Sequence, residues 1–236
     1  MSVDGEQTTT LSGTVSDCGP CPYLPGRAFH AFQPSEPARA AQLYRQLMDN
    51  RFRRSGAGFY MPSCPDCAAC RPVRVAVAAF RPRADQRRCA RRNADLTLTW
   101  HARGLDDERR ALFARYQQTV HGQATDSDPA DFLVIDGGVP GGELHAHDIQ
   151  GRLLAVSICD RFADALSSVY CYWDPDQAER GLGTFMVLAE IAHCRAANLP
   201  WLYLGFLVEA CGKMAYKARF TPQEVLVDDV WQRRGS

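Results

Sequence analysis

Residues 180–185 read Arg-Gly-Leu-Gly-Thr-Phe and open a mostly apolar segment, 184–197, which predicts a buried helix. Strands with alternating apolar and polar residues precede this segment, and a further strand and a short helix follow it. The predicted strands are 144–149, 153–159, 166–173 and 201–206, and the short helix lies near 211–217. A turn at Gln150-Gly151 joins the first two, so the first three strands are predicted to form an antiparallel meander.

This order of elements, with an Arg-x-x-Gly turn at a helix N-terminus, is similar to the GCN5-related acyltransferase fold. In that fold the backbone N–H groups of the turn hold the pyrophosphate of coenzyme A, as helix N-termini are suited to do. Phe185 stands where that turn carries Gly or Ala, and its ring would crowd a phosphate. We therefore predict an α/β (α+β) protein with an acyltransferase-like C-terminal domain, residues 101–236, and we disfavour coenzyme A.

Five cysteines in the first third of the chain follow the pattern of a metal site. Pairs of thiolates two residues apart can bind one tetrahedral ion, and zinc or an iron-sulfur cluster suits this spacing about equally. The alternative is a set of ordinary reduced thiols, since the polar segment 1–11 lacks the pattern of a secretion signal and disulfides are disfavoured. The candidate ligands are Cys18, Cys21, Cys64, Cys67 and Cys70.

Positive charge is concentrated in the first half, although the formal net charge of the chain is zero. Residues 51–92 hold eleven arginines against two acidic residues, Asp66 and Asp85. A predicted helix, 84–93, places four of these arginines on one face, where they can bind phosphates; the alternative is a solvated helix face. The candidate phosphate-binding residues are Arg53, Arg54, Arg87, Arg88, Arg91 and Arg92.

The remaining N-terminal sequence predicts a tail, 1–16, and a Cys-rich, Arg-rich α+β domain, 17–100. Within that domain, a helix after Ser35 carries Tyr44 and Leu47, and strands are expected at 59–61, 73–80 and 96–100. A helix at 106–121 then begins the C-terminal domain. No run of eighteen apolar residues occurs, so no membrane span is predicted.

The chain resembles the bacterial aspartate/glutamate leucyltransferases, a branch of the arginyl-tRNA-protein transferase family, which adds amino acids to protein N-termini. The segments that carry the resemblance are Cys21–Arg27, Phe52–Gly56, Cys64–Val75, Gln86–Asp95, Ser167–Tyr170, Leu182–Phe185, Leu202–Gly205 and Lys213–Lys217. Two features depart from the bacterial branch: the extra Cys18, and the stretch 206–210, where the family tends to be aromatic and basic.

The resemblance implies aminoacyl transfer, in which the α-amine of a protein beginning with Asp or Glu attacks the ester of an aminoacyl-tRNA. The product is marked for degradation through the N-end rule, in the cytoplasm, and no cofactor is required for the transfer. The resemblance also implies that the six candidate phosphate-binding arginines hold the acceptor phosphates of the tRNA. The segment similar to the family's C-terminal motif supplies Lys213, Lys217 and Arg219 as cations for the acidic side chain. Tyr203 and Tyr216 are candidates for passing a proton or orienting the ester.

Three other activities stay open at this level. Arginine, carried by arginyl-tRNA, is an alternative to leucine as the donated residue. A coenzyme A dependent N-acetyltransferase and a non-enzymatic RNA-binding module are the other two.

Overall fold

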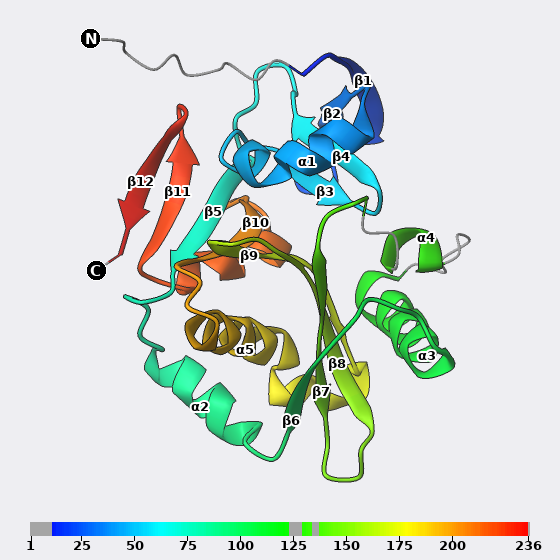
Figure 1. Cartoon of the computed structure of the whole chain (residues 1–236), viewed down its shortest axis with the longest axis vertical. Coiled ribbons are helices and arrows are strands. Elements are labelled where there is room, and N and C mark those ends of the chain that lie inside the picture. Colours follow the sequence, from blue (N-terminus) through cyan, green and yellow to red (C-terminus); the bar gives the residue numbers. More distant parts are fainter. Residues whose placement is uncertain (1–10, 123–128, 134–136, 236) are drawn as a thin grey trace.

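The computed structural model describes residues 11–122, 129–133 and 137–235, and their strands form two sheets. The smaller sheet has the strand order β1-β2-β4-β3, and the larger one has the order β12-β11-β5-β10-β9-β8-β7-β6. Figure 1 shows the smaller sheet and its helix α1 stacked on one end of the larger sheet.

The N-terminal lobe is built around helix α1, Pro37–Met48. Proline at the first helical turn leaves no hydrogen bond unmade, because the first N–H groups of a helix lack intrahelical acceptors. The helix buries Tyr44 and Met48, and the Tyr44 ring packs edge-on against Phe59. The strands of this lobe are β1 (Gly13–Pro20), β2 (Ala28–Pro34), β3 (Arg53–Ser55) and β4 (Gly58–Pro62).

The larger sheet contains the predicted meander, since β7, β8 and β9 pair antiparallel in that order. Helix α5 then carries the chain back across the sheet, so that β10 pairs parallel with β9. On its other side β10 pairs antiparallel with β5, which comes from the first third of the chain. The strands are β5 (Arg71–Ala76), β6 (Thr97–His101), β7 (Gly141–His147), β8 (Leu153–Arg161), β9 (Ala165–Trp173), β10 (Trp201–Leu207), β11 (Gln223–Val227) and β12 (Val230–Arg234).

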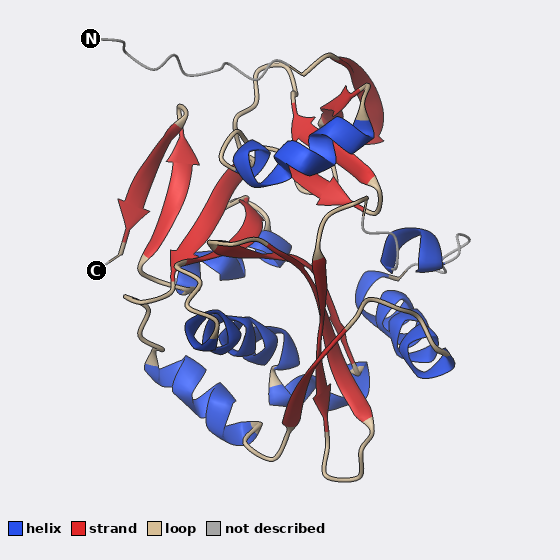
Figure 2. Cartoon of the chain, viewed as in Figure 1, coloured by secondary structure: helices blue, strands red, loops and turns tan. Residues whose placement is uncertain are grey.

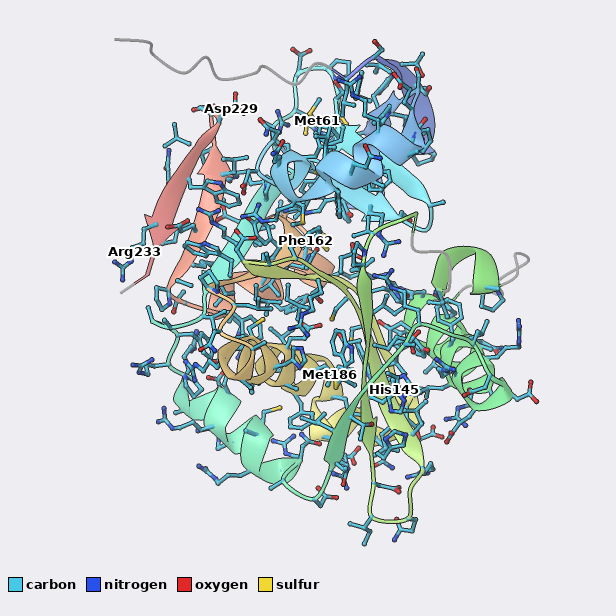
Figure 3. All side chains as sticks on the ribbon, viewed as in Figure 1. Met61, His145, Phe162, Met186, Asp229 and Arg233 are labelled. Carbon is cyan, nitrogen blue, oxygen red and sulfur yellow. The ribbon has the colours of Figure 1, made fainter. Side chains whose placement is uncertain are left out.

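Helices cover both faces of the larger sheet, as Figure 2 shows, with α2 and α5 on one side and α3 and α4 on the other. Helix α5 is the most buried of them and packs Val187 and Ile191 into the main core. Figure 3 labels Met186, which packs from α5 against β7 and β8. The helices are α2 (Ala84–Arg92), α3 (Asp107–Tyr116), α4 (Pro129–Leu133), α5 (Leu182–Ala196) and α6 (Gly212–Ala215).

Several boundaries differ from those predicted. Strand β1 begins at Gly13, inside the predicted tail, and residues 1–10 lie outside the described part. The predicted domain boundary at residue 100 does not separate the two sheets, because β5 and β6 belong to the larger one. Helix α3 ends at Tyr116 and continues as a π-helical turn, Gln117–His121. None of the helices in the described residues is long and apolar enough to cross a membrane.

A buried ion cluster joins the two lobes. Arg54 of β3 donates two hydrogen bonds to Asp160 at the end of β8, at 3.0 Å from Nε and 2.6 Å from Nη2. Arg103 donates to the same carboxylate, and the Asp160 side chain is fully buried. Burial raises the pKa of Asp160, and the two guanidinium groups oppose that effect. A carboxylate held by two cations in this way ties the small sheet to the large one.

We predict that Asp160→Asn destabilises the fold by about 3–5 kcal/mol, because it removes the buried negative charge to which both guanidinium groups bond. Urea denaturation followed by circular dichroism measures this change. Asp164→Asn is the matched control: it removes an Asp that pairs with Arg45 at 2.7 Å but is half-exposed, so it should change stability by less than about 1 kcal/mol. Equal effects of the two substitutions would contradict the role given to the cluster.

Candidate functional site

The candidate site lies where strands β9 and β10 diverge. Their parallel pairing ends at Ser167 and Tyr203, and beyond these residues β10 continues only along β5. The register along β5 shifts between Tyr203 and Phe206, and Gly205 has a φ of 78°, a conformation that favours glycine. Residues 168–171 of β9 extend beyond the part of the strand that pairs with β10 and are half-buried. The sheet therefore opens on the side of Ser168 and Gly205.

Two buried cations flank Gly205. Arg53 of β3 donates to the carbonyl oxygen of Gly205 at 3.1 Å, and Lys217 donates from Nζ to the carbonyl oxygen of Phe206 at 2.9 Å. A Cβ atom placed on Gly205 would lie 3.5 Å from Lys217 Nζ and 4.0 Å from Arg53 Nε. Both side chains therefore approach the same backbone position from the two lobes.

Neither cation forms an ion pair with any described carboxylate. Arg53 donates its remaining bonds to the carbonyl oxygens of Met48 and Phe52, and its buried Nε has no hydrogen-bond acceptor. Burial, with the nearby charge of Arg53, lowers the pKa of Lys217 to about 7. Burying two like charges without a carboxylate is unfavourable, and an anion bound between them would relieve it. The pair is therefore a candidate anion-binding site.

The two predicted catalytic tyrosines occupy different environments. Tyr216, one residue before Lys217, is the first residue of a short 3-10 helix, Tyr216–Arg219, and remains a candidate beside the diverging strands. Burial, with the charges of Cys171 and Glu190, raises the pKa of Tyr216. Tyr203, in contrast, is fully buried: its hydroxyl donates to Asp49 at 2.5 Å and accepts from Arg74 at 3.0 Å. Tyr203 holds α1 against β10, and the prediction of a catalytic role for it is corrected.

The predicted tRNA-binding arginines fall into two groups. Arg87, Arg88, Arg91 and Arg92 are all exposed on α2, whose opposite side buries Gln86 and Cys89. Within the described chain, Arg88 and Arg91 have no hydrogen-bond or ion-pair partner, while Arg87 and Arg92 donate to the carbonyl oxygens of Pro82 and Glu179. A shallow groove of about 350 Å³ beside these residues is lined by Arg87 and Arg91, together with Arg195 and apolar side chains. This face is basic and open to solvent.

Arg53 and Arg54 are not part of that face. Both are buried, Arg53 beside Gly205 and Arg54 in the ion cluster with Asp160. The two guanidinium groups therefore lie apart from the exposed α2 face that carries the other four predicted tRNA-binding arginines.

The three predicted substrate-binding cations are also separated. Of the three, only Lys217 lies beside Gly205, where it forms the candidate anion-binding pair with Arg53. Arg219 lies apart from them and forms an ion pair with Asp85 at the start of α2. Lys213 is exposed. Burial, with the positive charge of Lys213, lowers the pKa of His121 at the end of the π-helical turn.

Four of the five cysteines gather between the lobes. Burial and the charges of Cys21, Cys64 and Cys67 raise the pKa of Cys70 to about 12. Backbone N–H groups already point at two of the sulfurs, since Leu24 donates to Cys21 and His30 donates to Cys64. Cys18 is exposed on β1 and bonds to the Ser16 carbonyl oxygen, so its inclusion in the set is corrected.

The donor chemistry of four thiols suits zinc or iron, but their present positions do not form a metal site. Among residues 11–122, 129–133 and 137–235, no three His, Cys, Asp or Glu side chains are arranged to hold a metal ion. A metal would have to draw the sulfurs together, and no chemical step below depends on one.

The turn before α5 is too crowded for a pyrophosphate. A Cβ atom on Gly183 would lie 3.1 Å from the Trp173 ring, and the Cys89 thiol donates to the carbonyl oxygen of Gly181 at 3.4 Å. Phe185 is buried in the core next to Met186. Trp173 and Cys89 thus lie against the turn before α5, whereas the Phe185 ring, predicted to crowd a phosphate there, points into the core.

Comparisons with known proteins agree with the predicted family. Residues 19–88 match the model described as arginine-tRNA-protein transferase, N terminus, and residues 108–227 match its C-terminus counterpart. The chain belongs to the arginine-tRNA-protein transferase family. Among curated relatives of this family, the aspartate/glutamate leucyltransferase of Nitrosococcus oceani is 40% identical over 90% of this chain and 91% of its own length. Proteins of the same name from Chromobacterium violaceum and Methylobacterium sp. are 38% and 39% identical, covering 90% and 92% of this chain and 90% and 93% of their own.

The predicted fold class is also confirmed. A solved domain assigned to a lysylphosphatidylglycerol synthetase from Agrobacterium fabrum aligns with a TM-score of 0.51 at 14% identity. The alignment covers 82% of this transferase-family chain and 63% of that domain, and it shows a shared fold only.

We expect protein purified without air to contain zinc or iron held by Cys21, Cys64, Cys67 and Cys70. Cys70→Ser should lower the metal content per chain, because it removes one of the four thiols, the one whose pKa the other three raise. Cys18→Ser is the control and should leave the metal content unchanged, since that thiol is exposed and lies apart. Mass-spectrometric elemental analysis gives the stoichiometry, and wild-type protein free of both metals would contradict the expectation.

Proposed function

We propose that this protein transfers leucine from leucyl-tRNA to the N-terminus of proteins that begin with Asp or Glu, which marks them for degradation in the cytoplasm. The observation that carries the proposal is the pair of buried cations, Arg53 and Lys217, beside Gly205. The side chain of an N-terminal Asp or Glu is an anion short enough to enter such a site with its α-amine close behind. The names of the curated relatives support this choice of acceptor and donor.

The chemistry requires no covalent enzyme intermediate. The α-amine attacks the ester carbonyl carbon of the aminoacyl-tRNA, a C–N bond forms, and the ester C–O bond breaks. The amine loses a proton and the departing ribose oxygen gains one, so the reaction is balanced without a cofactor. Because the ester is already activated, much of the rate can come from holding amine and carbonyl in contact.

The exposed arginines of α2 supply a surface for the acceptor arm of the tRNA. Contacts to phosphates position a nucleic acid without reading its sequence, which suits an enzyme whose donor is defined by the attached amino acid. The crowded turn before α5 argues against coenzyme A as a rival donor. Arginyl-tRNA is the rival that transfer assays must separate from leucyl-tRNA.

The decisive test is transfer of radiolabelled leucine, and separately arginine, from charged tRNA to peptides that begin with Asp, Glu or Ala. We expect label from leucyl-tRNA on the Asp and Glu peptides only. Lys217→Gln should lower kcat/KM for the Asp peptide by roughly 10–100-fold, since it removes a charged hydrogen bond of about 1.5–3 kcal/mol.

Lys213→Gln is the matched control for that substitution, because Lys213 is the other lysine of the chain and is exposed on α6. It should retain wild-type discrimination between the Asp and Ala peptides. If Lys217→Gln discriminated as well as wild type, the acidic side chain would have to bind elsewhere. Transfer of arginine in place of leucine would change the donor and leave the acceptor site intact.

The α2 surface makes a separate prediction about salt. Replacing Arg88 and Arg91 by Ala should weaken binding of uncharged and charged tRNA alike. The slope of log K against log[salt] should fall by roughly 0.7–0.9 for each phosphate that the double variant no longer binds. Arg39→Ala, an exposed arginine on α1, should leave the slope unchanged. Filter binding at several salt concentrations measures both, and an unchanged slope in the double variant would remove α2 from the interface.

A further inference from the structure

Glu190 is a buried carboxylate that the reaction described above does not use. It lies on α5 with 1% of its surface exposed, one turn beyond Met186 on the face turned to the sheet. Its Oε1 accepts hydrogen bonds from the hydroxyl groups of Ser157 and Ser168, the second at 3.0 Å, and from the Cys159 thiol at 3.6 Å. Its Oε2 has no hydrogen-bond partner, and no Lys, Arg or His of the described chain pairs with it.

Such an arrangement is unfavourable for stability alone. A buried carboxylate without a cation is costly, and burial raises the pKa of Glu190 even though three hydrogen bonds oppose the shift. An amide of the same shape would tie β8 to β9 through the same serines without placing a charge in the core. Carboxyl groups in this condition are characteristic of proton-transfer sites.

Glu190 bonds to Ser168, which lies where strands β9 and β10 diverge. Strand β9 has a bulge against β8, because Ile158 pairs with Tyr170 and Cys159 with Ser168, which leaves Val169 as the extra residue. Ser168 is the first residue of β9 beyond its pairing with β10 and is half-buried, whereas Ser157 is fully buried. Glu190 also raises the pKa of Tyr216, which neighbours Lys217 in the chain. Ser168 thus bonds to the buried carboxylate at the point where β9 leaves β10.

We propose that Glu190, acting through the Ser168 hydroxyl, accepts the proton that the acceptor α-amine loses and returns it to the departing ribose oxygen. As the amine nitrogen bonds to the carbonyl carbon it becomes positively charged and gives a proton to Ser168 Oγ, whose own proton passes to Glu190. When the ester C–O bond breaks, the proton travels back through Ser168 to the ribose oxygen. This inference rests on the proposed aminoacyl transfer, and it holds for either leucine or arginine as donor.

The other titratable groups around Glu190 stay neutral over the relevant pH range. They are the thiols of Cys159 on β8, Cys171 on β9 and Cys194 on α5, and the phenol of Tyr216 on the following 3-10 helix. Burial raises the pKa of each of these groups, as it does that of Glu190.

The test compares Glu190→Gln, Ser168→Ala and Ser157→Ala in single-turnover transfer between pH 5 and 9. We expect Glu190→Gln to lower the rate by roughly 100-fold and to abolish the fall in rate toward acid pH, with the KM for tRNA and peptide unchanged. Ser168→Ala should lose rate to a similar degree. Ser157→Ala is the comparison variant, because Ser157 also bonds Glu190 but is fully buried and cannot pass the proton; it should keep an acid limb, displaced to higher pH because a hydrogen bond that lowers the pKa of Glu190 is lost.

The outcomes separate this inference from a structural role and from the proposed function. Thermal unfolding of Glu190→Gln should occur at or above the wild-type midpoint, which excludes a folding defect as the cause of a reduced rate. A wild-type rate and pH profile in Glu190→Gln would overturn the inference, as would equal losses in the two serine variants with the acid limb retained. Wild-type protein that transfers neither leucine nor arginine would overturn the proposed function and the inference together.

Discussion

The buried contact between Arg54 and Asp160 sets the position of the candidate site. Successive side chains of a strand point to opposite faces, so fixing Arg54 toward Asp160 turns its neighbour Arg53 the other way, toward Gly205. Asp160 pairs with Arg54 and Arg103, whereas the adjacent Arg53 forms no ion pair with any described carboxylate. One short strand, β3, therefore both joins the lobes and presents a cation to the opening between β9 and β10.

Two local irregularities of the larger sheet lie where strands β9 and β10 diverge. The register shift along β10, with Gly205 in a left-handed conformation, turns two carbonyl oxygens toward Arg53 and Lys217. The bulge between β8 and β9 lies beside Ser168 and the buried Glu190. Bulges re-aim side chains at the edges of sheets and next to active sites. Here they occur on both of the strands that part.

The local periodicity of the sequence was sufficient to predict the meander, α5 and the arginine face of α2, because each depends on residues close together in the chain. Strands such as β3 and β11 were missed, since they are short and are held by partners far away in sequence. The burial of Arg54 was missed for a related reason: its place in a basic cluster indicated exposure, whereas Asp160, more than a hundred residues later, buries it. Glu190 left one signal, as the single acid within the apolar run of α5.

The separation of charges across the opening agrees with the charges of the proposed acceptor. An N-terminal Asp or Glu carries a carboxylate that needs a cation and, a few bonds away, an amine that must lose a proton. If Lys217 and Glu190 were in contact, each would neutralise the other and neither would be available. Instead Lys217 bonds to a carbonyl oxygen of β10, while Glu190 bonds to hydroxyl groups of β8 and β9. Because β9 and β10 diverge, Lys217 and Glu190 bond to different strands and do not neutralise one another.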